Sequence, residues 1–274
     1  MPNAMPSRAH VITGGFPPGQ PAGHDHDYAR LRLLQFLAEM EVPASVGNDF
    51  SEVGKWLDRS RLLITYTAGP FPDEDQNRAI REWLVNGGRW IGLHGTSGGR
   101  AVRVGESGRR RAMLKGSFHE TLGGFFINHP PVRKFTVDVS ERPHPLTRDL
   151  PPSFEIVDEL YMIELQDPAA SEVVLTTASM GADPSPPGFG FVYDTDTSLQ
   201  ADGKTRVLGY TREVGDGGVA YIAPGHCHTP ATNSQPFVDV SVDPEGKTPP
   251  VLRGPWETAA YATLLRNAIR WGMG

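Results

Sequence analysis

The chain has 274 residues, of which 38% are hydrophobic and 21% charged, so it can bury a sizeable core as ordinary globular proteins do. Its 26 basic and 32 acidic residues give a formal net charge of −6, which does not suit a protein that coats a nucleic acid. The one cysteine, Cys227, excludes an internal disulfide, and no apolar stretch approaches the roughly 20 residues that cross a bilayer. We therefore expect a cytoplasmic protein with neither a nucleic-acid nor a membrane partner.

Strands and helices alternate along the first part of the chain. Short apolar runs bounded by turn residues predict strands, and apolar residues at helical spacing predict helices. The predicted strands cover 9–13, 42–46, 61–67 and 90–93, and the predicted helices cover 27–40 and 80–85, with Asp27 as the N-cap of the first helix. This order predicts an α/β fold with a mostly parallel sheet and helices on both faces.

The second part of the chain has a less regular pattern. We expect one or two strands within 125–139, further strands at 173–177, 207–211 and 218–223, and a final helix over 256–271. Two proline-rich stretches, 181–190 and 234–255, predict long surface loops, and the basic run Arg109–Arg111 is interpreted as a solvated loop. No linker divides the chain, so we expect one domain over 9–274, preceded by a flexible leader at 1–8.

His94 lies in the segment WIGLHGTSGG, directly after a predicted central strand. Gly92 and Gly95 on either side allow a tight, strained turn from strand to helix. Such a turn would hold the imidazole exposed at the carboxyl edge of the sheet, where ligands bind in open α/β folds. An imidazole there can move a proton or bind a metal.

Two other interpretations of this segment stay open. The letters around Ser97 match the GxSxG nucleophile elbow of hydrolases, but that motif needs its serine directly after the strand, and Ser97 follows His94 by three positions. A serine hydrolase would also need His226 or His228 within hydrogen-bonding reach of Ser97. The glycine-rich turn could instead bind a phosphate, although neither GxGxxG nor GxxxxGK is present.

Two HxH pairs, His24 with His26 and His226 with His228, are expected at the same edge of the sheet as His94. Imidazoles and carboxylates are ligands that zinc and other transition metals accept. Asp158 and Glu159 add carboxylates that can orient an imidazole or act in acid–base catalysis. Cys227, between the second pair, is either a reactive thiol or a small buried apolar residue.

Six segments in order resemble the trehalose-utilisation (ThuA-like) family. They are HDYARLRLLQFL, WLVNGGRWIGLHGTS, LGGFFINHP, HPLTRDLPPSFEIVDELY, GGVAYIAPGH and LLRNAIRW, and the resemblance covers the chain from about His10 to Trp271. The resemblance implies the flavodoxin-like fold of the class I glutamine amidotransferase-like superfamily. The proline-rich stretch between His228 and Trp256 departs from the compact family pattern.

The resemblance also bears on chemistry. His94 stands where a glutamine amidotransferase would carry its cysteine nucleophile, and Cys227 follows a different strand, so amidotransferase chemistry is not expected. The family is associated with the use of sugars, notably oxidised disaccharides. The pocket positions that the resemblance implies are His26, Asp27, His94, His129, Glu159 and His226.

The leading hypothesis is an enzyme that acts on a sugar or keto-sugar by histidine and carboxylate acid–base chemistry, as an isomerase, lyase or hydrolase. In it His94 moves the proton, Glu159 is its partner carboxylate, and His226 acts as an electrophile. His26 and His226 are the candidate ligands of a divalent metal such as zinc, although the cofactor is open. A sugar-binding or regulatory module without turnover is the alternative.

Four further residues are expected to contact the substrate: Asp27, Thr96, His129 and Tyr161. The expected partner is a small sugar, and a homo-oligomer is compatible with the sequence.

Overall fold

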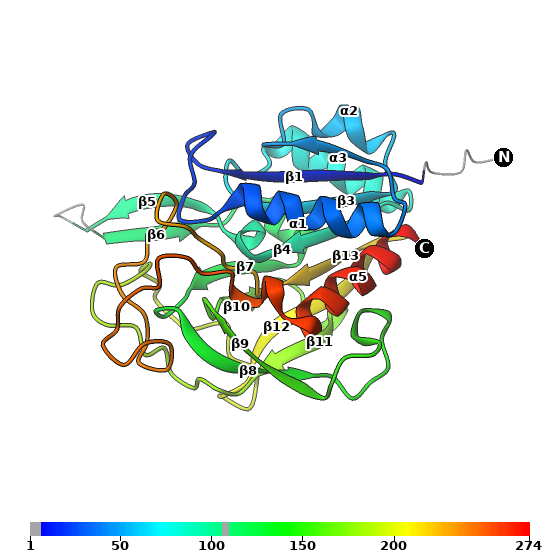
Figure 1. Ribbon diagram of the computed structural model, residues 1–274. Coiled ribbons are helices and arrows are strands. Elements are labelled where there is room, and N and C mark those ends of the chain that lie inside the picture. The colour runs from blue at the N-terminus through cyan, green and yellow to red at the C-terminus, as the bar shows by residue number, and fades with distance from the viewer. Residues whose placement is uncertain (1–6, 106–109) are drawn as a thin grey trace.

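The computed structural model describes residues 7–105 and 110–274. Its main sheet has nine strands in the order β2-β1-β3-β4-β13-β12-β11-β8-β9 (Figure 1). The parallel part consists of β2 (Ala44–Gly47), β1 (Ala9–Gly15), β3 (Leu62–Ala68), β4 (Arg89–Leu93) and β13 (Gly217–Ile222). An antiparallel extension adds β12 (Arg206–Val214), β11 (Glu172–Thr177), β8 (Arg133–Val139) and β9 (Ser153–Asp158).

Two small sheets flank the main one. β7 (Gly124–Asn128) pairs with β10 (Met162–Leu165), and β5 (Arg100–Val104) forms a hairpin with β6 (Arg110–Leu114). The predicted strand region 125–139 therefore divides between β7 and β8, which belong to different sheets. The β5–β6 hairpin, β9 and β10 were not predicted, because β5 and β6 are arginine-rich and mostly exposed, β9 is partly exposed, and β10 has only four residues.

Helices cover both faces of the main sheet, as the sequence predicted. α1 (His26–Glu39) and α5 (Ala259–Met273) lie over one face and contact each other (Figure 1), while α3 (Glu74–Val85) packs on the other face against β13. The short helices α2 (Val53–Leu57) and α4 (Phe118–Leu122) both contact α3, and four 3-10 turns, η1 (His94–Ser97), η2 (Pro145–Thr147), η3 (Pro168–Ala170) and η4 (Gly254–Glu257), complete the chain.

Local capping explains where the helices begin. α3 starts at a capping box in which Asp73 accepts from the Gln76 N–H and Gln76 accepts from the Asp73 N–H. The N-cap of α1 is Asp25, whose carboxylate accepts from the Tyr28 N–H at 3.1 Å, so the prediction of Asp27 as N-cap was wrong by two positions. Both candidates are aspartates, and only tertiary contacts choose between them: Asp25 also pairs with Arg253 at 2.7 Å.

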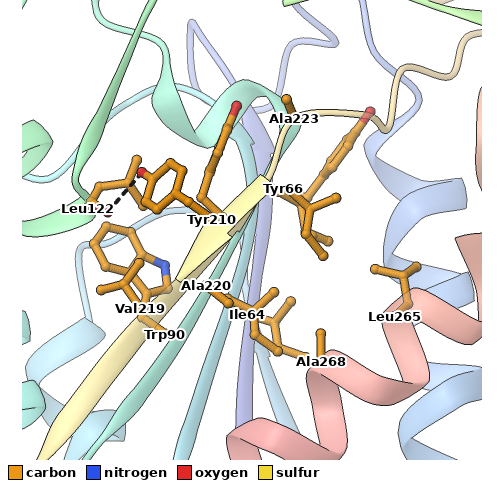
Figure 2. Close-up of a cluster of buried hydrophobic side chains, with 14 of the residues drawn as sticks. Ile64, Tyr66, Trp90, Leu122, Tyr210, Val219, Ala220, Ala223, Leu265 and Ala268 are labelled. Carbon is orange, nitrogen blue, oxygen red and sulfur yellow. Dashed lines mark hydrogen bonds between the residues drawn. The ribbon is translucent and has the colours of Figure 1, made fainter. Parts of the chain in front are cut away.

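The core lies beneath the carboxyl edge of the parallel strands. Figure 2 shows Ile64 of β3 and Ala220 of β13 facing Leu265 and Ala268 of α5, all of them buried. Trp90 of β4 is fully buried, and its indole N–H donates to the Thr65 hydroxyl at 2.9 Å. Burial of this kind contributes about 25 cal/mol per Å² of apolar surface, so these strands form a rigid support for the loops above them.

Two other expectations concern the ends and the membrane. Residues 1–6 of the predicted leader lie outside the described residues, whereas the carbonyl of Arg8 accepts hydrogen bonds from the Arg61 and Leu62 N–H groups. Among the described helices, none has the length and apolar character that crossing a bilayer demands.

Candidate functional site

Four buried side chains converge at the carboxyl edge of the sheet. His94 follows β4 and His226 follows the neighbouring parallel strand β13. Glu159 follows β9, and His24 comes from the loop between β1 and α1. One nitrogen from each histidine and one oxygen of Glu159 lie within 4.8 Å of one another.

His94 sits on a strained backbone turn. Its φ is +43°, in the left-handed region that a non-glycine residue adopts at a cost of about 1–3 kcal/mol. Gly95 permits the turn, because a Cβ at that position would lie 2.4 Å from the Thr67 carbonyl oxygen. The strained strand-to-helix turn is therefore confirmed, but the expected exposure is wrong: the His94 side chain is 0% exposed, because the histidine cluster and Tyr161 cover it.

Glu159 is the centre of the cluster. Its Oε2 lies 3.2 Å from His94 Nε2 and 3.9 Å from His24 Nε2, and its Oε1 lies 3.3 Å from His226 Nδ1. Although burial opposes ionisation, the nearby imidazoles of His129 and His226 stabilise the carboxylate and hold the pKa of Glu159 well below its usual value. Glu159 is therefore a carboxylate at neutral pH.

Backbone carbonyls fix the tautomers of two imidazoles. His94 Nδ1 lies 2.8 Å from the Ala223 carbonyl oxygen, and His24 Nδ1 lies 2.9 Å from the Ala22 carbonyl oxygen. Because a carbonyl only accepts, each Nδ1 carries the proton and donates it. In the neutral ring, the Nε2 lone pair of each histidine then points into the cluster.

A relay of two histidines fixes the third. His228 Nε2 donates to the Pro249 carbonyl at 2.9 Å, which leaves its Nδ1 as an acceptor. His226 Nε2 donates to that Nδ1 at 2.9 Å, so the Nδ1 of His226 also presents a lone pair to the cluster.

The inner atoms of the cluster have no hydrogen-bond partner among the described residues. They are Nε2 of His24, Nε2 of His94, Nδ1 of His226 and Oε2 of Glu159, and all are buried. Burial lowers the pKa of His24 well below 6.5 and also lowers that of His226, which keeps both rings neutral. For His94, burial acts in the same direction, but the carboxylates of Glu159 and Asp158 outweigh it and raise the pKa.

The donor set fits a divalent transition metal. Neutral imidazoles and a carboxylate are the protonation states that bind metal, and outer nitrogens on carbonyls or on another histidine are the usual support of a metal-bound histidine. Unpaired buried polar atoms are costly in a protein without a ligand for them. His24, His94, Glu159 and His226 are therefore the residues that could hold a metal here.

Asp158 holds the two halves of the site together. Its carboxylate accepts from the N–H groups of Gly225 at 2.6 Å, His226 at 2.9 Å and Glu159 at 2.7 Å. Burial raises the pKa of Asp158 to about 7, while the Gly225 and His226 donors oppose that shift. This side chain thus ties the end of β9 to the segment after β13.

His129 and Tyr161 lie against the cluster. His129 Nδ1 donates to the Pro130 carbonyl at 2.8 Å, and its Nε2 lies 3.6 Å from Glu159 Oε1, with 12% of the side chain exposed. The Tyr161 ring stacks on His94 with 4.0 Å between ring centroids. Gln235, from a long proline-rich segment, donates its amide N–H to Glu159 Oε1.

Three residues expected in the pocket lie apart from the cluster's inner atoms. Asp27 is exposed and pairs with Arg30 at 2.9 Å. Thr96 is buried, and its hydroxyl bonds to the hydroxyl and the carbonyl of Thr65. His26 is close by, but its Nε2 bonds to the Pro21 carbonyl at 3.0 Å, and His24 takes the place in the group that was expected for His26.

The other nucleophile candidates are engaged elsewhere. The Ser97 hydroxyl bonds to the Tyr221 hydroxyl at 2.7 Å and to the His94 carbonyl at 3.3 Å, and no described histidine ring hydrogen-bonds to it. Cys227 is buried beside Tyr66, and burial raises its thiol pKa to about 12. The thiol is thus the small buried residue that the sequence offered as one of two interpretations.

Most of the chain matches one family of known proteins. Residues 21–241 match the ThuA family, which is described as trehalose utilisation. The chain belongs to the ThuA family. No curated protein matches the chain.

Solved structures of ThuA-like proteins have the same fold. A putative ThuA-like protein from Bacteroides uniformis superimposes with a TM-score of 0.59 at 18% identity, over 98% of this chain and 92% of that one. One from Parabacteroides merdae gives a TM-score of 0.58 at 17% identity, over 98% and 90%. Part of a β-galactosidase from Rahnella sp. R3, 29% of its length, matches 80% of this chain with a TM-score of 0.52 at 13% identity. The flavodoxin-like α/β fold that the ThuA resemblance implied is confirmed.

The sequence did not single out Gln235, and it did not predict the role of His228. Gln235 lies in a segment without regular structure, and no spacing pattern marks it. His228 belongs to an HxH pair, but its role as the outer partner of His226 depends on the Pro249 carbonyl, which only the fold brings near.

Proposed function

We propose that this ThuA-family protein is an enzyme that acts on a sugar or keto-sugar by histidine and carboxylate acid–base chemistry, with a divalent metal held by His24, His94, Glu159 and His226. One observation carries the proposal: the inner atoms of these four buried residues converge within 4.8 Å and have no hydrogen-bond partner in the part of the chain that the structure describes. The family description, trehalose utilisation, supports a sugar as the substrate class.

The metal would supply Lewis acidity at a substrate oxygen. The chain orients its ligands, because the carbonyls of Ala22 and Ala223 and the ring of His228 accept hydrogen bonds from the outer nitrogens of the three imidazoles, which leaves the inner nitrogens for a metal. Zinc and other borderline metals accept such nitrogen and oxygen donors.

We assign the proton transfer to His129 and no longer to His94. His94 Nε2 is fully buried and faces Glu159, whereas His129 is partly exposed and lines the cavity beside the cluster. Because His129 Nδ1 donates to Pro130, the Nε2 lone pair is free to accept a proton from a substrate carbon.

A keto group acidifies the neighbouring C–H bond. His129 would take that proton, and the imidazolium would return it to the adjacent carbon or to a leaving oxygen, which gives isomerisation or elimination without any redox partner. Tyr161 is buried and stacks on His94, so its ring covers one face of that imidazole.

The test is proton exchange at carbon. The protein is loaded with zinc, cobalt or manganese and incubated with a 3-keto-disaccharide in D2O, and NMR follows deuterium incorporation and product. His129→Gln is expected to slow the reaction by about 10²–10⁴-fold, while His144→Gln, which removes a histidine outside the site, is expected to keep the rate. Binding of the sugar without exchange by the loaded wild type would contradict the enzyme proposal and support a binding module.

A further inference from the structure

A cavity of about 310 Å³ opens beside the histidine cluster. Its walls come from three places: Arg110 and Arg111 of β6, residues 188–192, and residues 234–236. His129 also lines it, so the cavity and the cluster share one side chain. The basic run was interpreted as a solvated loop, but Arg110 and Arg111 belong to a strand, and Arg109 lies outside the described residues.

The two guanidinium groups are not neutralised within the described part of the chain. Neither Arg110 nor Arg111 forms an ion pair with a described residue, although the chain carries a net charge of −6. Across the hairpin Arg111 stands directly opposite Arg103, a pairing of like charges that destabilises a sheet. A concentration of unpaired arginines at a concave surface is the pattern of a site for a carboxylate or phosphate.

Arg111 is held in place by its surroundings. Its guanidinium lies over the Phe191 ring at 5.0 Å from the centroid, and its carbonyl accepts from the Val192 N–H at 2.7 Å. The facing wall is anchored to β7, because Asn128 Oδ1 accepts from the Phe191 N–H at 2.9 Å. The Asn128 amide also donates to Asp183 at 2.9 Å, so this one side chain joins β7 to two points of the segment that forms the wall.

Gln235 connects the cavity to the cluster. Its amide N–H donates to Glu159 Oε1. Its own Oε1 is buried and has no hydrogen-bond partner among residues 7–105 and 110–274, and the residue is only 8% exposed. Since Gln235 also lines the cavity, this unpaired acceptor is available to a hydroxyl group of a bound molecule.

We propose that this cavity is a subsite for an oxyanion, a carboxylate or a phosphate ester, on the same molecule whose reacting carbon reaches His129. Arg111 and Arg110 bind the oxyanion, and Gln235 Oε1 accepts from a hydroxyl between the two ends. The link to the reacting carbon rests on the proposed function, whereas binding of the oxyanion does not. The substrate class is therefore an acidic or phosphorylated sugar.

The test compares three ligands that share one ring: glucose, glucuronate and glucose 6-phosphate. Calorimetric titration of the full chain is expected to show that at least one of the two anions binds about tenfold or more tightly than glucose, as charged hydrogen bonds usually permit. Preference for glucuronate identifies a carboxylate subsite, and preference for glucose 6-phosphate a phosphate subsite. Equal affinities for all three ligands would overturn the proposal.

Two variants make the test specific. Arg111→Met keeps an unbranched, flexible stem but removes the guanidinium, and it is expected to abolish the preference for the anion. Arg100→Met removes the same charge from the same hairpin at a position that pairs with Leu114 outside the cavity, and it is expected to preserve the preference. An equal loss in both variants would show a general field of charge and overturn the subsite. Measuring the titration and the proton exchange on the same wild-type protein separates the two proposals. A preference for the anion without any proton exchange contradicts the proposed function alone.

Discussion

His226 donates its Nε2–H to His228 Nδ1 across 2.9 Å, and this single hydrogen bond determines which nitrogen of His226 faces Glu159. The direction follows from Pro249, whose carbonyl accepts from His228 Nε2 and thereby leaves Nδ1 of His228 unprotonated. His228 also forms an antiparallel backbone bridge with Leu252. The proline-rich segment between His228 and Trp256 is thus part of the support of the site.

Replacing His228 tests this relay. In His228→Phe the ring volume stays similar, but His226 loses the acceptor that fixes its tautomer. We expect the affinity for zinc to fall by about 10–100-fold, as for other outer partners of metal-bound histidines. Competition with a chromogenic chelator measures it, and His144→Gln controls for the loss of one histidine elsewhere; an unchanged affinity in His228→Phe would refute the relay.

Replacing Gly95 by alanine tests the strained turn at His94. In Gly95→Ala the new Cβ meets the Thr67 carbonyl oxygen at 2.4 Å, so η1 must shift and carry His94 with it. We expect a loss of about 2 kcal/mol or more in the free energy of unfolding together with weaker metal binding. Gly181→Ala is the matched control, because a Cβ there has open space and an ordinary φ. Equal unfolding curves for the two variants would contradict the constraint on the turn.

The pH dependence of stability includes a contribution from His10, away from the site. Burial lowers its pKa from 6.5 to about 4, with Arg8 acting in the same direction and Glu52 and Ser45 opposing it. The folded chain therefore keeps His10 neutral between these pH values while the unfolded chain takes up a proton. The free energy of unfolding should fall as the pH is lowered from 6.5 to 4.

His10→Gln should reduce that decline by roughly 1–2 kcal/mol, since partial solvent access weakens the effect. Urea unfolding of both proteins at pH 8 and at pH 4.5 measures the decline. At pH 8 His10 is neutral in the folded and the unfolded chain, so its titration contributes nothing to the free energy of unfolding there. A decline of the same size in the variant and in wild type would contradict the assignment.

The sequence was sufficient to place most of the site because parallel strands end at one edge. A buried run followed by His94, and another followed by His226, predicts two neighbouring imidazoles once β4 and β13 are parallel partners. The HxH spacing did not show that His24, and not His26, joins the cluster. Moving the helix start to Asp25 turns His26 toward Pro21 and leaves His24 in the loop that faces Glu159.

Long-range contacts explain what the sequence did not predict. The position of Gln235 depends on the path of a segment without regular structure, which is held by such bonds as the Asp239 N–H to the Val132 carbonyl at 2.9 Å. Likewise, Arg110 and Arg111 could be assigned to a cavity only after the wall around Phe191 was anchored by Asn128. No periodic pattern in the nearby sequence marks either of these contacts.

The most direct test of the metal centre is the metal content of three proteins: wild type, His24→Gln and His26→Gln. Each is stripped with a chelator, reloaded with zinc, dialysed and analysed for bound metal. We predict about one equivalent in wild type and in His26→Gln, and a strong loss in His24→Gln, because only His24 of this pair presents a free nitrogen to Glu159. Wild type that retains no metal, or two variants that retain equal amounts, would contradict the assignment of His24, His94, Glu159 and His226 as the ligands.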